Sequence, residues 1–302
     1  MGVSLINLGM SSKDEREMMG LGYLPELSDI RDLSVMSKEI FEVLEPTKVL
    51  KAAPSTLPAS VDLRQWCSPI ENQVQLGSCT ANAGVGLFEY FERRAYGKYI
   101  DASRLFLYKA TRDLMQVTGD TGAYIRSTMG AMAVFGVPPE KYWPYDISKF
   151  DIEPSAFLYS FADEFKAIQY YRLDPAGATT DVVLAKIKAN IAAGLPAEFG
   201  FTVYDSISQA STTGKIPFPC GREKVLGGHA IDAVGYDDNM VITNTKCNLA
   251  TKGALLIRNS WGTSWGDKGY GWLPYDYVLK GIANDWWTLV TAGWIDTGQF
   301  GF

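Results

Sequence analysis

The sequence predicts an α+β fold of two lobes, a helical lobe over about residues 57–160 and a β lobe over about residues 161–302. Two observations predict it. Apolar side chains recur at helical spacing through the first half, whereas short strand-like runs separated by Gly and Asp turns fill the second half. Because helices precede strands instead of alternating with them, we expect two lobes with a ligand cleft between them.

Composition narrows the class of protein. The chain has 302 residues, of which 47% are hydrophobic and 21% charged, enough for a sizeable core. Its formal net charge of −6 and the lack of a Lys/Arg cluster argue against a nucleic-acid partner or a membrane-surface role. No run approaches the roughly 18 apolar residues of a spanning helix. The first residues lack the basic start of a signal peptide, so we expect a cytoplasmic location or export by a non-standard route.

Residues 1–56 form an N-terminal extension that differs from the rest of the chain. It holds one helix-like piece at residues 37–44 and ends in a stretch broken by Pro46, Pro54 and Pro58. The segment is too small for a core of its own. We expect an arm or linker attached to a catalytic or binding domain at residues 57–302.

The helices of the first lobe follow from apolar periodicity and caps. Ser103 is an N-cap residue by type and position, and Gly136 with Pro138 and Pro139 ends the third helix. The expected helices are residues 79–95, 103–115 and 125–135, with one more at 181–193 that stops at Gly194.

The strands of the second lobe are short and rich in β-branched and aromatic residues, which is typical of an antiparallel sheet or barrel. The expected strands are residues 197–203, 229–236, 253–261, 269–275 and 286–290.

Four cysteines limit the possible cross-links and metal sites. If Cys79 is a catalytic thiol, Cys67, Cys220 and Cys247 can form at most one internal disulfide, and their pairing stays open. No two cysteines have close metal-ligand spacing and there is one histidine, so we expect neither a metal nor another cofactor.

The single histidine, His229, is the one candidate for a general base of the usual kind near neutral pH. It follows a pair of glycines at the start of an expected strand. A buried histidine with a purely structural hydrogen bond would look the same when taken alone.

Cys79 follows a Gly-containing turn and begins an expected helix. The positive end of a helix dipole lowers a thiol pKa, and the thiolate is the nucleophilic form. A small buried apolar residue at this position is the alternative. Gln73, six residues earlier, could donate its side-chain amide to an oxyanion, together with a backbone N–H at the helix start.

A third motif, residues 258–272, contains Asn259, Trp261 and Trp265. The Asn259 side-chain oxygen could accept the His229 ring N–H and fix the productive tautomer. The two tryptophans could shield that bond from water. A strand end with two core aromatics is the alternative.

Taken together, these motifs resemble the papain family of cysteine proteases. Gln73, Gly77-Ser78-Cys79, Gly228-His229-Ala230 and Asn259-Ser260-Trp261-Gly262 occur in the family's order, and Leu57-Pro58 through Leu63-Arg64 resembles the start of its mature enzymes. The resemblance implies a helical left lobe, an antiparallel β-barrel right lobe and a cleft between them. It implies Cys79 as nucleophile, His229 as base, Asn259 as its orienter, and Gln73 in the oxyanion hole.

The resemblance also implies where a peptide or protein substrate binds. Gly122, Ala123 and Tyr124 fall where the family pairs with substrate backbone and begins its S2 pocket, and Gly228 and Trp261 should line the cleft. With Tyr124 and Ile125 on one wall and Gly227 and Gly228 on the other, we expect apolar residues second before the scissile bond. We also expect the N-terminal extension to occupy this cleft as an inhibitory prosegment.

Three departures from the family pattern favour its bacterial branch. Leu76 stands where a disulfide cysteine is usual, Thr80 replaces the Trp after the nucleophile, and Ala123 replaces a glycine. None removes a catalytic group. An acyl- or peptidyl-transferase on the same fold and a catalytically silent peptide-binding module remain alternatives.

Overall fold

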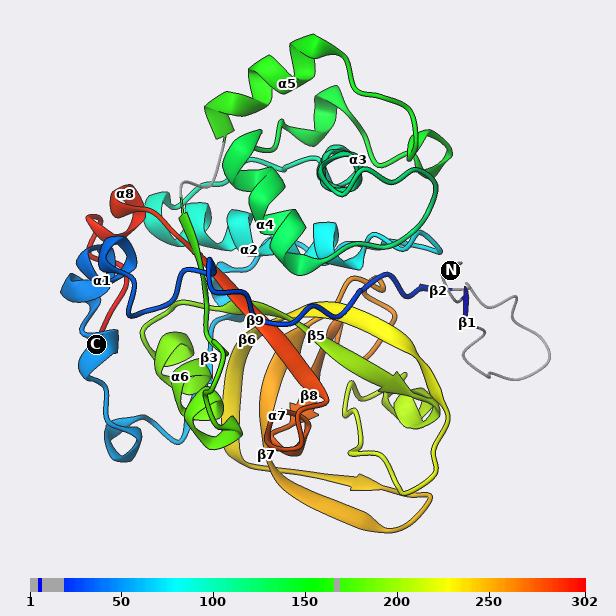
Figure 1. Ribbon diagram of the computed structural model, residues 1–302. Helices are drawn as coiled ribbons and strands as arrows, with labels where there is room; N and C mark the ends of the chain where they lie inside the picture. The colour runs from blue at the N-terminus through cyan, green and yellow to red at the C-terminus, as the bar shows by residue number, and fades with distance from the viewer. Residues whose placement is uncertain (1–4, 7–18, 166–168) are drawn as a thin grey trace.

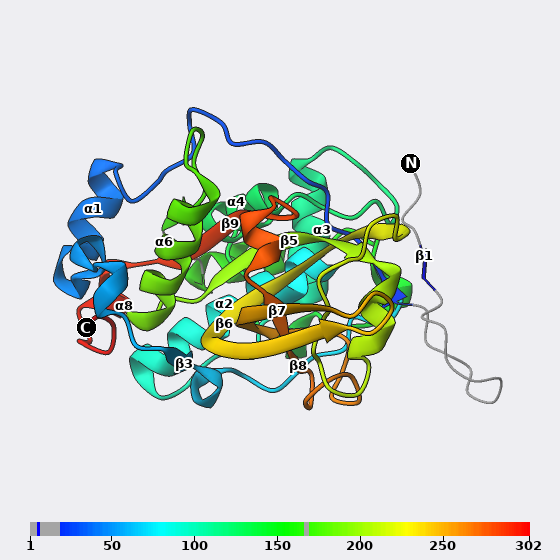
Figure 2. The same ribbon diagram turned by 90° about the horizontal axis from the view of Figure 1, so that it is seen from below.

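The computed structural model describes residues 5–6, 19–165 and 169–302. The helices of residues 79–162 gather on one side of the molecule, and a curved antiparallel sheet lies on the other side together with α6 (Thr180–Ala192) and α7 (Asp276–Leu279), as Figure 1 shows. The chain between β2 (Met19–Gly20) and α1 (Lys38–Leu44) runs between these two parts in Figure 1, and in Figure 2, seen from below, it follows one edge of the molecule to α1. The two lobes expected from the sequence are therefore present.

Helix α2 (Cys79–Tyr96) is the central helix of the molecule. Every residue from Cys79 to Phe91 is buried, because α3 and α4 pack on one side of the helix and the sheet packs on the other. The helix ends at Gly97, whose φ of +69° is a left-handed conformation that glycine adopts at low cost. Ser103 caps α3 by accepting a hydrogen bond from the Phe106 amide. The other helices are α3 (Arg104–Leu114), α4 (Ile125–Val134), α5 (Ala156–Ala162), α6 (Thr180–Ala192), α7 (Asp276–Leu279) and α8 (Ala292–Ile295).

The main sheet has seven strands, ordered β4-β9-β5-β6-β7-β8, with β3 paired to β6. All of its pairings are antiparallel. Its inward faces are strongly apolar, and Phe199 stacks on Trp286 with ring centroids 3.9 Å apart. The strands are β3 (Ser60–Asp62), β4 (Gln169–Arg172), β5 (Ala197–Tyr204), β6 (Val225–Asn244), β7 (Leu249–Arg258), β8 (Tyr270–Pro274) and β9 (Ala283–Val290); a separate pair joins β1 (Leu5–Ile6) to β2.

The C-terminal residues return from the sheet to the helical lobe. Trp294 on α8 stacks on Phe91 of α2, with ring centroids 4.9 Å apart and planes 3° from parallel. The chain end lies beside α1, as Figure 1 shows. The C-terminal end of the chain therefore packs on the helical lobe and beside α1.

The helices expected at residues 79–95, 103–115, 125–135 and 181–193 are confirmed as α2, α3, α4 and α6, and the five expected strands as β5 to β9. One segment departs from the expected division. Ser60–Asp62 falls in the range given to the helical lobe, yet it pairs with Gly235–Asp237 of β6. A run of three residues is too short to show the alternating pattern of a strand.

Cys220 and Cys247 form a disulfide, while Cys67 and Cys79 are free. Among the described residues, no helix is long and apolar enough to cross a membrane.

Candidate active site

Cys79 is the first residue of α2 and its side chain is fully buried. Burial raises the pKa of its thiol to about 12. The backbone amides of Ala230, Gly22 and Thr80 act in the opposite direction, because each can donate to a thiolate. Ala230 directly follows His229, so the thiol faces the strand that carries the histidine. In this buried state the thiol is protonated at neutral pH.

His229 lies on β6, fully buried, with Nε2 at 2.8 Å from the Asn259 Oδ1 atom. That oxygen also accepts the Ser260 N–H at 2.8 Å, which identifies it as the carbonyl oxygen of the amide. An acceptor there requires the proton on Nε2, leaving Nδ1 as the basic nitrogen. Within the described part of the chain Nδ1 has no hydrogen-bond partner. Burial lowers the His229 pKa to about 4, although the Asn259 hydrogen bond opposes this.

Asn259 follows the last residue of β7, and its backbone N–H donates to the Gly269 carbonyl at 3.0 Å. Trp261 covers the bond between the two side chains: its ring stacks on His229 with centroids 4.5 Å apart and planes 18° from parallel. Trp265 packs edge-on against Trp261. Excluding water strengthens a hydrogen bond, so these aromatics hold the imidazole in one orientation.

Gln73 is fully buried in the loop before α2, and both ends of its side-chain amide are engaged. Its oxygen accepts the Ser260 hydroxyl at 2.5 Å, which leaves the nitrogen as a fixed donor. The nitrogen donates to the Leu76 carbonyl and to the Gly20 carbonyl, each at 3.0 Å. The donor proposed for an oxyanion thus already holds a peptide carbonyl, which comes from the protein's own N-terminal extension.

The cleft between the lobes contains residues 20–24 of the extension. Ala123 accepts from the Leu24 amide at 3.0 Å and donates to the Gly22 carbonyl at 2.8 Å, a parallel pairing centred on Tyr23. On the β lobe, the Tyr23 amide donates to the Gly228 carbonyl at 3.2 Å. Ala123 and Gly228, both expected to bind substrate, therefore hold the two sides of one extended peptide.

The other expected substrate-binding residues have different environments. Gly122 has a φ of +72°, and a Cβ there would lie 2.2 Å from the Gly22 carbonyl oxygen. Tyr124 is the N-cap residue of α4. Trp261 stacks on His229 as described above. The structure thus brings together Cys79, His229, Asn259, Gln73, Ala123, Gly122 and Gly228 around the extended segment.

Sequence reasoning missed two groups of residues here. Tyr108 and Asp120 support the wall of the cleft: the Tyr108 hydroxyl accepts from the Gly122 amide and donates to Asp120, which accepts the Gly77 amide at 3.0 Å. Gly200 and Asn284 contact the Tyr23 side chain. An isolated glycine inside a strand, such as Gly200, often marks a close approach and was the one available signal.

No group of three or more His, Cys, Asp or Glu side chains in the described part of the chain could hold a metal ion. The chemistry available at the site is that of a thiol, an imidazole and amide donors.

Comparison with known proteins identifies the family to which the chain belongs. The family model described as papain family cysteine protease matches residues 57–287. An uncharacterized peptidase C1-like protein of Acanthamoeba polyphaga mimivirus is 34% identical over 281 residues, covering 89% of this chain and 86% of its own. Xylellain, a cysteine protease from Xylella fastidiosa, superposes with a TM-score of 0.70 at 32% identity, covering 93% of this chain and 99% of its own. A ragweed pollen cysteine protease in its proform shares the fold, with a TM-score of 0.59 at 24% identity over 80% of this chain and 68% of its own. The chain belongs to the papain family of cysteine proteases.

Proposed function

We propose that this cysteine protease is an endopeptidase that works through a thioester acyl-enzyme and is inhibited by its own N-terminal extension. The observation that carries the catalytic part is the pairing of His229 Nε2 with Asn259, which leaves Nδ1 free as a base. The inhibitory part is carried by Gln73, whose side-chain amide donates to the Gly20 carbonyl of the extension.

Each proposed catalytic residue has a defined part in the reaction. His229 Nδ1 takes the proton of the Cys79 thiol, and the sulfur attacks the carbonyl carbon of the scissile bond. The Gln73 amide and the Cys79 backbone N–H stabilise the oxyanion that forms. The imidazolium returns its proton to the leaving amine as the C–N bond breaks and the thioester forms. Water, deprotonated by His229, then hydrolyses the thioester and releases the acid and the thiol.

The extension meets three requirements of an inhibitory segment. It is bonded to both lobes through Ala123 and Gly228, it covers Cys79, and it engages the oxyanion donor Gln73. Its fit is tight: a Cβ on Gly22 would lie 1.8 Å from the Gly77 carbonyl oxygen. Tethering raises the effective concentration of such a segment to about millimolar, so even weak docking would occupy the cleft.

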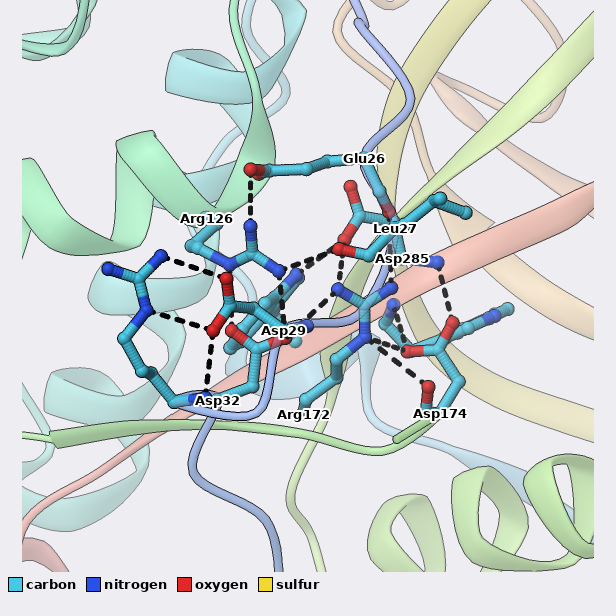
Figure 3. Close-up of polar contacts among 11 residues, drawn as sticks. Glu26, Leu27, Asp29, Asp32, Arg126, Arg172, Asp174 and Asp285 are labelled. Carbon is cyan, nitrogen blue, oxygen red and sulfur yellow. Dashed lines mark hydrogen bonds and ion pairs between the residues drawn. The ribbon is translucent and has the colours of Figure 1, made fainter. Parts of the chain in front are cut away.

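A cluster of ion pairs anchors the extension just beyond the cleft (Figure 3). Arg126 of α4 forms a bidentate pair with Asp32 at 2.7 and 2.8 Å and also pairs with Glu26. Arg172 of β4 lies 3.5 Å from the same Asp32 carboxylate and 3.1 Å from Asp285. Asp32 is the shared partner of arginines from two separate elements. Its side chain is 5% exposed, so these pairs are shielded from solvent.

Neutralising this anchor should activate the full-length protein. Asp32→Asn keeps the size of the side chain but removes its charge, which weakens the pairs with Arg126 and Arg172. Loss of a charged hydrogen bond of this kind costs about 1–2 kcal/mol, so peptide hydrolysis should rise roughly 5- to 30-fold. The measurement is the rate of hydrolysis of a small fluorogenic peptide.

Asp29→Asn is the matched control for Asp32→Asn. Asp29 lies in the same loop but forms its ion pair with Arg31, which is 85% exposed, so its loss should change the rate little. Equal activation by both variants would contradict a specific anchor at Asp32.

The covered state also predicts an unusual pH dependence of Cys79 alkylation. Because the thiol pKa is raised to about 12 when the cleft is filled, the thiolate fraction should increase with every step from pH 7 to 10. When the extension leaves the cleft, Cys79 lies beside the imidazole and at the helix N-terminus, where thiol pKa values fall to about 3.5–7.5. The alkylation rate should then level off at a lower pH. Iodoacetamide labelling mapped to Cys79 in wild type and in full-length Gly22→Ala compares the two states; identical pH profiles would contradict the covering.

The experiment that tests the function as a whole analyses products. The full-length protein is incubated with an unfolded protein substrate, with and without an added amine, and new termini are identified by mass spectrometry. An endopeptidase gives internal cleavage with free carboxyl ends under both conditions. Amide products formed with the amine would indicate a transferase, since both nucleophiles use the same acyl-enzyme. Unchanged substrate in the presence of an activated variant would indicate a silent binding module.

A further inference from the structure

The Tyr23 side chain fills a pocket of the β lobe beside the proposed active site. The amide of Gly22 faces the Cys79 thiol, and the next residue, Tyr23, lies between Ala123 and Gly228. The resemblance to the family places these two residues at the walls of the pocket for the second residue before the scissile bond. Its backbone bonds to Gly228 and its side chain is almost fully buried, 6% exposed for the residue. The pocket that it fills, called here the Tyr23 pocket, is formed by Gly200, Gly228, Asn284 and Asp285.

Two glycines make room for an aromatic ring in this pocket. A Cβ on Gly200 would lie 2.0 Å from the ring carbon that carries the hydroxyl, and a Cβ on Gly228 would lie 2.9 Å from another ring carbon. Both contacts are shorter than any real Cβ makes, so even an alanine at either position would collide with the ring. Strand β5 thus has glycine where the ring of Tyr23 crosses it.

The far end of the pocket presents hydrogen-bond acceptors. The Tyr23 hydroxyl donates to the Asn284 Oδ1 atom at 2.8 Å, and the Asn284 amide nitrogen faces the Gly281 carbonyl at 3.3 Å, which fixes the oxygen toward the pocket. Asp285, next in the chain, is fully buried, and its Oδ2 atom has no hydrogen-bond partner in the described part of the chain. Burial, followed by the negative charge of Asp285, raises the Tyr23 pKa, so the phenol stays a proton donor.

We propose that the Tyr23 pocket selects substrates with tyrosine at the second residue before the scissile bond, with Gly200 admitting the ring and Asn284 accepting the hydroxyl. The inference rests on the proposed peptidase function and adds its substrate class. It changes the expectation of a general apolar preference, because phenylalanine fills the same space but leaves the acceptors unpaired.

A basic side chain suits the pocket less well than tyrosine does. Asp285 is already paired with Arg172 at 3.1 Å, and its Oδ1 atom accepts the Trp287 indole N–H at 2.7 Å. Arg172 brings its positive charge close to the same site, which opposes a second cation. A neutral donor satisfies the acceptors without that repulsion.

The test uses full-length Tyr23→Ala, in which the pocket is vacated by its resident side chain. Matched fluorogenic peptides that differ only in Tyr, Phe, Leu or Arg at the second residue before the scissile bond are compared by kcat/KM. The expected order is Tyr, then Phe, then Leu, with Arg last. A net hydrogen bond of about 0.5–1.5 kcal/mol gives a Tyr to Phe ratio of roughly 3 to 10.

Two further substitutions in that background separate the two parts of the proposal. Asn284→Ala should lower the Tyr to Phe ratio to about one, because only the tyrosine hydroxyl uses the acceptor that this substitution removes. Gly200→Ala should lower kcat/KM for both aromatic peptides much more than for the Leu peptide, because its methyl group occupies the ring position. Gly221→Ala is the matched control, because a Cβ there meets no atom within 4 Å and no cleft residue.

An activity-independent readout uses the extension itself. Tyr23→Phe and Asn284→Ala should each speed alkylation of Cys79 in the otherwise intact chain several-fold, and the double variant should add nothing further, because both remove one hydrogen bond. Additive effects would overturn the pairing.

The outcomes also separate this proposal from the peptidase function. Equal cleavage of the Tyr and Phe peptides, or a Tyr preference that survives Asn284→Ala, overturns the pocket proposal while leaving the peptidase intact. Hydrolysis of none of the four peptides overturns the peptidase function, and the pocket proposal with it.

Discussion

Replacing Cys79 with alanine should lower peptide hydrolysis by several orders of magnitude and leave a folded protein. The side chain is the only thiol at the start of α2, and removal of a covalent nucleophile in comparable triads costs about 10⁶-fold in kcat. The small apolar replacement suits a fully buried position, so the fold should persist. The measurement is kcat/KM on a fluorogenic peptide in the Gly22→Ala background, with circular dichroism as the check on folding.

Cys67→Ala is the control for this substitution. Cys67 is also a free and buried thiol, and burial raises its pKa to about 11. Its sulfur lies 3.8 Å from the Leu63 carbonyl, outside the cleft residues described above. This variant should keep near wild-type kcat/KM. Loss of activity in Cys67→Ala together with normal activity in Cys79→Ala would show that Cys79 is not the nucleophile.

Adding one methyl group to Gly22 should activate the full-length protein. The Cβ of Gly22→Ala would lie 1.8 Å from the Gly77 carbonyl oxygen and 2.4 Å from the Gly77 carbonyl carbon, and backbone atoms cannot rotate away as a side chain can. Overpacking of this kind costs about 1–3 kcal/mol, so the docked segment should be disfavoured and hydrolysis should rise roughly 5- to 150-fold. The initial rate on a small fluorogenic peptide measures the effect.

The control for Gly22→Ala is Gly221→Ala, since a Cβ at Gly221 meets no atom within 4 Å. Gly221→Ala should leave the rate of the covered protein unchanged. If Gly22→Ala is as inactive as wild type while Cys79 remains intact, the segment does not block the site.

The sequence allowed the fold class and the proposed catalytic residues to be predicted because both depend on local pattern. Helix α2 begins where a Gly-Ser-Cys turn meets an apolar period, and Asn259 follows a strand that is rich in branched residues. His229 needed no choice between candidates because the chain has one histidine. Their placement in one cleft was implied by the resemblance to the papain family, which the order of these motifs carries.

Contacts between distant segments could not be predicted in the same way. The hydrogen bond from Tyr23 to Asn284 joins residues 261 positions apart, and the role of Gly200 depends on a ring supplied by the extension. The pairing of Cys220 with Cys247 depends on how the β6–β7 hairpin folds back, which composition does not specify. The Asp32 anchor likewise requires two arginines from different elements to meet.

The most direct test of the account is the site and rate of labelling by a thiol-directed epoxide, followed by intact mass and peptide mapping. The account predicts one adduct, on Cys79, formed slowly in wild type and at least several-fold faster in full-length Gly22→Ala. His229→Ala in the Gly22→Ala background should label far more slowly, because the thiol loses its base. An adduct on Cys67, or equal rates in wild type and Gly22→Ala, would contradict a Cys79 nucleophile covered by residues 20–24.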